Sequence, residues 1–267
     1  MSLTYDPDHP LFIAPSTRLR IDEAEKALDL CYQTGRPVLI YLHGRAKDVG
    51  EPKKSVNTGI YRELEAYGVA VLGFTWDADD PGYDENRAVA SSDDFARLLK
   101  SLRSYLDSHN VQAPSLLAHS MGNIIVAEAA KDELLGPAAG TLITNLILTS
   151  AAVKTKRHAK WLDLIEAAER IFVPVNTHDL VLGFAGLAFR PNMLGKDLQG
   201  PGARSPKVTY VDISACKVNH RYFVPQGQNR HVGLKSLYAD WATGLPPRFN
   251  DIAMPDEMNG VPVLRVV

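Results

Sequence analysis

The sequence has few cysteines, no long apolar run and almost no net charge. Its two cysteines, Cys31 and Cys216, are too few for a disulfide framework, so we interpret both as reduced thiols. A membrane-spanning helix needs roughly 18 continuous apolar residues, and the chain contains no such stretch. The 29 Lys and Arg residues are balanced by 31 Asp and Glu residues. The composition therefore argues against a secreted disulfide scaffold, a membrane span and a nucleic-acid-binding protein.

The first ten residues, MSLTYDPDHP, lack the basic and apolar regions of a secretory signal. We expect a cytoplasmic protein on these grounds. Oligomeric state is left open, because composition says nothing about it.

Short apolar runs alternate with longer amphipathic stretches over most of the 267 residues. The runs have continuous apolar character without in-out alternation, which is typical of strands buried on both faces of a parallel sheet. The predicted strands are 38–42, 69–74, 115–118, 146–149, 171–175 and 208–213. Helical spacing is found over 21–32, 56–67, 86–106 and 234–243. This alternation predicts an α/β fold, a doubly wound and mostly parallel sheet flanked by helices.

The chain contains neither internal repeats nor a low-complexity linker. We therefore expect a single domain over 1–267, with a core at about 37–244. Proline and glycine become frequent after Gly244, so we interpret 245–267 as a C-terminal tail packed on the surface.

The most informative segment runs from 116 to 126, where an apolar strand leads through a tight turn into a helix. Ser120 stands at the turn, with Ala118 two residues before it and Gly122 two residues after it. This is the spacing of a nucleophile elbow, G-x-S-x-G, with alanine in place of the first glycine. The turn lifts the serine oxygen above the sheet, and the flanking residues must be small because the neighbouring backbone lies close. The helix N-terminus next to Ser120 favours developing negative charge.

An oxyanion hole needs two N–H donors. One is the amide of Met121, directly after the nucleophile, and the other is most simply the amide of Arg45, in the loop after the strand 38–42. Gly44 allows the backbone to approach the substrate oxygen. We interpret His43 as a residue that shapes this loop and does not transfer protons.

A serine hydroxyl needs an imidazole to take its proton and a carboxylate to orient that imidazole. Asp179 follows the predicted strand 171–175, at the edge where catalytic groups gather in open α/β sheets. It is the predicted acid, although it also suits the N-cap of a helix that begins at Leu180. Asp212, at the end of the last strand, is the main alternative.

Two histidines follow the last strand and are candidates for the base. His220 comes soon after the strand, where a loop can fold back over Ser120, and we favour it. His231 directly precedes the last predicted helix, where it suits a cap or a surface position.

With these residues the chain resembles the α/β-hydrolase superfamily, and more narrowly an uncharacterised family whose elbow reads A-H-S-M-G-N. Ala118 departs from the superfamily's usual glycine but agrees with this branch. The likeness covers about 37–241 and includes the segments 74–76, 83–84 with the helix 88–96, 147–152, the Asp179 segment and 219–223. The resemblance implies a Ser-Asp-His hydrolase without metal or organic cofactor, and it supports His220 over His231.

The sequence therefore predicts a serine hydrolase that cleaves a small-molecule carboxylic ester. The interval between Ser150 and Asp179 holds no long insertion, so we expect little or no lid and short or medium acyl chains. An acyltransferase with the same site and a non-catalytic binding protein on this scaffold are the alternatives. Apolar residues of the excursion 183–206 either wall the substrate pocket or pack into the core: Phe184, Leu187, Phe189, Met193 and Leu194.

Overall fold

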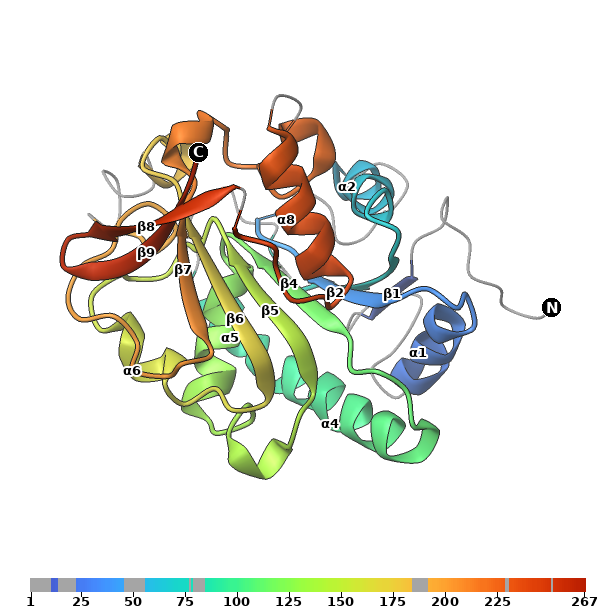
Figure 1. Cartoon of the computed structure of the whole chain (residues 1–267). Helices are drawn as coiled ribbons and strands as arrows, with labels where there is room; N and C mark the ends of the chain where they lie inside the picture. Colours follow the sequence, from blue (N-terminus) through green and yellow to red (C-terminus); the bar gives the residue numbers. More distant parts are fainter. Residues whose placement is uncertain are drawn as a thin grey trace.

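The computed structural model describes residues 11–13, 23–45, 56–76, 78, 85–183, 192–228, 231–250 and 252–267. Within them lies one nine-stranded sheet with the order β1-β3-β2-β4-β5-β6-β7-β9-β8 (Figure 1). Neighbouring strands are parallel except for β8 and β9. The strands are β1 (Leu11–Ile13), β2 (Val38–Leu42), β3 (Ala70–Phe74), β4 (Ser115–His119), β5 (Ile143–Thr149), β6 (Ala168–Val175), β7 (Val208–Asp212), β8 (Ala253–Met258) and β9 (Val261–Val266).

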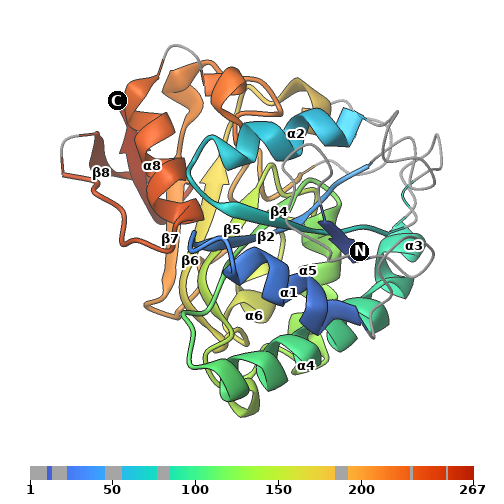
Figure 2. The same ribbon diagram turned by 90° about the vertical axis from the view of Figure 1, so that its right-hand side faces the viewer.

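Helices cover both faces of this sheet. The helices include α1 (Ala24–Tyr32), α2 (Val56–Glu65), α3 (Glu85–Ala90), α4 (Ser92–His109), α5 (Gly122–Lys131), α6 (His158–Leu162) and α8 (Val232–Ala242). Figures 1 and 2 show α2 and α8 on one face, and α1, α4, α5 and α6 on the other. The two apolar clusters divide in the same way, which confirms the predicted doubly wound arrangement.

Four of the six predicted strands form because their apolar runs are buried on both sides. Every residue of β2, β3, β4 and β5 is buried, whereas β6 and β7 each have residues near their start that are exposed or partly exposed. A strand with no solvated face has no polar positions to alternate, so its sequence is a continuous apolar run.

The predicted helix 86–106 is divided into α3 and α4. Two serines lie at the division and hydrogen bond to carbonyls of the preceding turn. Ser91 Oγ donates to the carbonyl of Arg87 at 2.9 Å, and Ser92 Oγ donates to that of Val89 at 2.7 Å.

The prediction of a surface tail at 245–267 is wrong for most of that segment. β8 and β9 form a hairpin that extends the sheet, and β9 pairs in parallel with β7 through Val211 and Leu264. The turn between the two strands is Asn259-Gly260, both at positive φ, which is a strong two-residue hairpin signal. The sheet also includes β1, before the predicted start of the core.

The structure describes two of the five apolar residues named above in the segment 183–206. Met193 and Leu194 are buried in the core cluster that α5 also contributes to, so they do not wall a pocket. Phe184, Leu187 and Phe189 lie outside the described residues.

Candidate active site

Ser120 lies at a sharp turn between β4 and α5. Its φ of 53° is in the left-handed region, where a residue with a side chain is uncommon and strained. Gly122 makes the turn possible, because a Cβ there would lie 2.7 Å from the carbonyl oxygen of Leu42. The structure thus has the strand–turn–helix context that a nucleophile elbow requires.

Backbone hydrogen bonds hold this turn against β5. Ser120 N–H donates to the carbonyl of Thr149 at 3.1 Å, and the Ser120 carbonyl accepts from Ala152 N–H at 3.1 Å. Asn123 adds a side-chain amide, which lies 3.1 Å from the Ala118 carbonyl, 3.0 Å from that of Ser120 and 3.2 Å from that of Thr149. We did not predict a role for Asn123. Its position three residues after Ser120, within the first turn of α5, was the available signal.

The loop after β2 lies directly against Ser120. A Cβ on Gly44 would lie 2.6 Å from the Cβ of Ser120 and 2.9 Å from the His119 carbonyl oxygen. Arg45 follows this glycine, and Met121 precedes α5 as its N-cap. The Met121 N–H precedes the repeating i→i−4 hydrogen bonds of α5. The two amides predicted to form an oxyanion hole therefore belong to segments that meet at the nucleophile.

His43 holds the Gly44 loop in place. Burial lowers the pKa of His43 from 6.5 to about 4, so its ring is neutral near neutral pH. Nε2 accepts from the Trp76 backbone N–H at 3.3 Å, and Nδ1 donates to the Gly44 carbonyl at 2.6 Å. Trp76 Nε1–H also donates to the His43 carbonyl at 2.8 Å, and the two rings stack. These contacts agree with the predicted loop-shaping role.

Asp179, which is buried, and His220, which is partly buried, form a hydrogen-bonded pair. His220 Nδ1 lies 2.8 Å from Asp179 Oδ2, and the carboxylate is fully buried beyond the end of β6. The other carboxylate oxygen, Oδ1, accepts the N–H of Leu182 at 3.0 Å. Asp179 therefore combines the two roles considered for it. Oδ1 caps the helix that follows, and Oδ2 bonds to the histidine.

The alternative residues have other partners. Asp212 Oδ1 accepts the Ser214 N–H at 2.9 Å, and Oδ2 lies 3.0 Å from Nε of Arg265. His231 is the N-cap residue of α8. Neither residue belongs to the Asp179–His220 pair.

The loop that carries His220 is fixed by three side chains. Ser150 Oγ donates to the His220 carbonyl at 2.9 Å, and the Tyr222 hydroxyl accepts the Ser150 N–H at 2.7 Å. Asn176 Nδ2 donates to the Val218 carbonyl at 2.9 Å. The sequence offered only one hint of this arrangement, the presence of Tyr222 two residues after His220.

The loop brings His220 to the elbow. Its ring centroid lies 4.8 Å from that of His119, the residue directly before Ser120. The candidate nucleophile, base and acid, which come from three distant parts of the sequence, thus gather at the carboxyl ends of β4 and β6.

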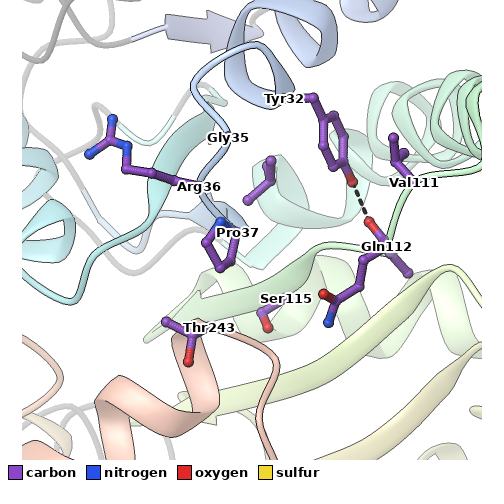
Figure 3. Close-up of a pocket in the computed structure, with 10 residues that line it drawn as sticks. Tyr32, Gly35, Arg36, Pro37, Val111, Gln112, Ser115 and Thr243 are labelled. Atoms are coloured by element: carbon purple, nitrogen blue, oxygen red, sulfur yellow. Dashed lines mark hydrogen bonds between the residues drawn. The ribbon is translucent and has the colours of Figure 1, made fainter.

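A cavity of about 290 Å³ opens near the amino ends of the strands, opposite the carboxyl ends where Ser120 lies (Figure 3). It is lined by residues that precede β2 and β4, among them Gly35, Pro37 and Gln112, and by Ser115 at the start of β4. Ser115 begins β4 and Ser120 directly follows the end of that strand, five residues later, so the rise of a strand puts the cavity roughly 16 Å from the nucleophile. This cavity is therefore distinct from the candidate active site.

In the part of the chain that the structure describes, no group of three or more His, Cys, Asp and Glu residues is placed to hold a metal ion. Over the same residues, no helix combines the length and apolar character needed to cross a bilayer.

A protein-family model matches a large part of the chain. The family described as alpha/beta hydrolase of unknown function (DUF900) matches residues 22–187, which include Ser120 and Asp179 and end before His220. No curated protein matches the chain. Because the match spans more than half of the chain, the protein belongs to this family of alpha/beta hydrolases.

Proposed function

We propose that this protein is a serine hydrolase that cleaves a carboxylic ester, with Ser120 as nucleophile, His220 as base and Asp179 as the orienting acid. The proposal rests above all on the 2.8 Å hydrogen bond between His220 Nδ1 and the buried Asp179 Oδ2, beside an elbow serine. A histidine held in one tautomer by a buried carboxylate is the arrangement that activates a serine hydroxyl.

The first half of the reaction forms an acyl-enzyme. Ser120 Oγ bonds to the ester carbonyl carbon while its proton passes to His220 Nε2. The Nδ1–H of His220 stays hydrogen bonded to Asp179, which stabilises the imidazolium. The Met121 and Arg45 amides donate to the oxyanion, each contributing about 3 kcal/mol to the transition state. The imidazolium then protonates the leaving alcohol as the carbon–oxygen bond breaks.

The second half releases the acid. A water molecule gives its proton to His220 Nε2 and attacks the acyl carbon. The bond to Ser120 Oγ breaks, and that oxygen recovers its proton from the imidazolium. The carboxylic acid leaves and the neutral site is restored, so no oxidant, reductant or metal is consumed.

The segment between β5 and Asp179 favours a small substrate. Residues 151–178 consist of a short stretch around α6 followed by β6, a core strand. No described residue of that interval builds a separate lid. We therefore expect short or medium acyl esters to be cleaved best.

Labelling with a fluorophosphonate probe tests the nucleophile. The probe phosphonylates a serine oxygen, with loss of fluoride, only where a base has activated that serine, so wild type should be labelled and Ser120→Ala should not. Circular dichroism of both proteins provides the control for folding. Absence of labelling in well-folded wild type would refute the hydrolase proposal and favour a binding protein on this scaffold.

A panel of p-nitrophenyl esters tests the base. His220→Ala should lower kcat by several orders of magnitude, on the order of 10⁴-fold or more, because the nucleophile loses its proton acceptor. His231→Ala is the matched control and should leave kcat nearly unchanged. Loss of activity in His231→Ala alone would show that the base has been assigned wrongly.

A further inference from the structure

His119 lies between the two loops that meet at Ser120. It is the last residue of β4, and its ring nitrogen Nδ1 would lie 3.2 Å from a Cβ on Gly44. On the other side its ring centroid lies 4.8 Å from the His220 ring, with a tilt of 57° between the planes. The same imidazole therefore contacts the loop of the predicted oxyanion hole and the ring of the predicted base.

The His119 ring is packed on further sides and is uncharged. Its centroid lies 4.5 Å from that of Phe223, which itself stacks on Tyr41. Only 8% of the residue is exposed. Burial, reinforced by the neighbouring His220 and Arg221 side chains, holds the pKa of His119 well below 6.5. A neutral ring adds no repulsion to the imidazolium that His220 forms during catalysis.

One nitrogen of this ring is not used for structure. His119 Nε2 is buried and has no hydrogen-bond partner among the described residues. A buried polar atom without a partner destabilises a fold. A hydrogen bond from Nε2 therefore does not explain why a histidine occupies this position. What remains is the rest of the ring: its flat face, the space that it fills, and a hydrogen bond with the His220 backbone that opposes part of the lowering of the His119 pKa.

We infer that His119 is a positioning residue, whose ring fixes the distance between the Gly44 loop and His220 so that the imidazole stays aligned with Ser120. This inference rests on the proposed function, because it assigns His119 a role in the same site. His119 does not itself exchange a proton. It acts through the ring of His220.

Kinetics of two substitutions test this role. His119→Ala removes the ring and should lower kcat on the order of 100-fold, the cost of a misplacement of about 1 Å. Its KM should stay within about threefold of wild type, because ground-state binding is not altered. His119→Phe keeps a flat ring without nitrogens and should restore most of kcat. Active sites are counted by fluorophosphonate titration, so that a loss of folded protein is not scored as a loss of kcat.

A proton resonance provides a readout that needs no turnover. The Nδ1 proton of His220, hydrogen bonded to Asp179, should give a downfield signal in wild type, in Ser120→Ala and in His119→Phe. In His119→Ala this signal should broaden or disappear, because the imidazole is no longer held. His119→Asn, which also lacks the ring, replaces His119→Ala if that variant does not fold and should behave in the same way.

The outcomes separate this inference from the proposed function. If wild type shows the downfield signal but is not labelled by the probe, the hydrolase proposal is contradicted. The comparison of this signal among the His119 variants still tests the positioning role. His119→Ala with wild-type kcat and an unchanged signal refutes the positioning role. His119→Phe as inactive as His119→Ala also refutes it, because the ring alone would then be insufficient.

Discussion

Gly44 and Ser120 lie so close that no side chain fits between them. A Cβ on Gly44 would lie 2.6 Å from the Cβ of Ser120 and 2.9 Å from the carbonyl oxygen of His119. Backbone and Cβ atoms cannot move aside as the end of a flexible side chain can. The loop of the predicted oxyanion hole therefore owes its position to the absence of a side chain at residue 44.

Gly44→Ala should reduce ester hydrolysis strongly. The added methyl group pushes the Arg45 amide away from the substrate oxygen, and loss of one oxyanion donor costs on the order of 10²–10³ in kcat. The assay is hydrolysis of a p-nitrophenyl ester. Gly59→Ala is the matched control, since a Cβ at Gly59 in α2 meets nothing within 4 Å. The control should keep wild-type kcat, and similar losses in both variants would contradict the explanation.

Asp179→Asn should lower kcat by about 10⁴-fold without unfolding the protein, because asparagine does not hold the imidazole in the required tautomer. The helix cap should survive, because an amide oxygen can still accept the Leu182 N–H. Asp212→Asn tests the alternative acid. It weakens the contact with Arg265, so it should lower thermal stability and leave kcat unchanged. The reverse pattern of kcat values would identify Asp212 as the acid.

Two substitutions of Ser150 should slow catalysis while differing in stability. Both Ser150→Ala and Ser150→Gly remove the hydroxyl that donates to the His220 carbonyl, and each should lower kcat by about tenfold. The φ of Ser150 is 45°, in the region that favours glycine. Ser150→Gly should therefore be more stable than Ser150→Ala by about 1 kcal/mol in urea unfolding. Equal stabilities would show that this backbone angle carries no strain.

Stability should fall in mild acid partly because of His43. Its pKa is about 4 in the folded protein, against the ordinary 6.5 expected after unfolding. Between these values the unfolded chain binds a proton that the folded protein does not. The contribution of His43 to the free energy of unfolding is therefore complete above pH 6.5 and is lost as the pH falls toward 4. Between pH 7 and pH 5 it amounts to about 2 kcal/mol.

Urea unfolding at the two pH values measures this effect. His43→Gln cannot gain the proton, so its stability should depend less steeply on pH, whatever its absolute stability. His109→Gln, at the exposed end of α4, is the control and should keep the wild-type slope. A wild-type slope in His43→Gln would show that the buried imidazole does not contribute.

The central sheet could be predicted because strands buried on both faces have continuous apolar sequences. The hairpin of β8 and β9 escaped prediction, since β8 reads AMPDEM and has little apolar alternation. Its charged and proline residues suit the outer edge of a sheet, where they discourage pairing with another chain. The signal that was present, Asn259-Gly260, lay in a segment interpreted as a tail.

The elbow could be predicted because its chemistry depends on five consecutive residues. For the candidate acid, the sequence could rank Asp179 above Asp212 but could not tell which of them meets a histidine, because both follow a strand. The two residues differ in their tertiary contacts. Asp179 hydrogen bonds to His220, 41 residues later, and Asp212 hydrogen bonds to Arg265, 53 residues later. The contacts of His119, Ser150 and Asn176 with neighbouring loops likewise depend on how distant segments fold together.

The pairing of β7 with β9 also has a consequence for how the chain is made. Val211 pairs with Leu264 and Asp212 with Arg265, so β7 stays at an open sheet edge until the ribosome has released residues 261–266. Such late, long-range pairing slows folding and leaves strand groups open to neighbouring chains. Polypeptides that stop before residue 261 should therefore aggregate, even though they contain Ser120, Asp179 and His220.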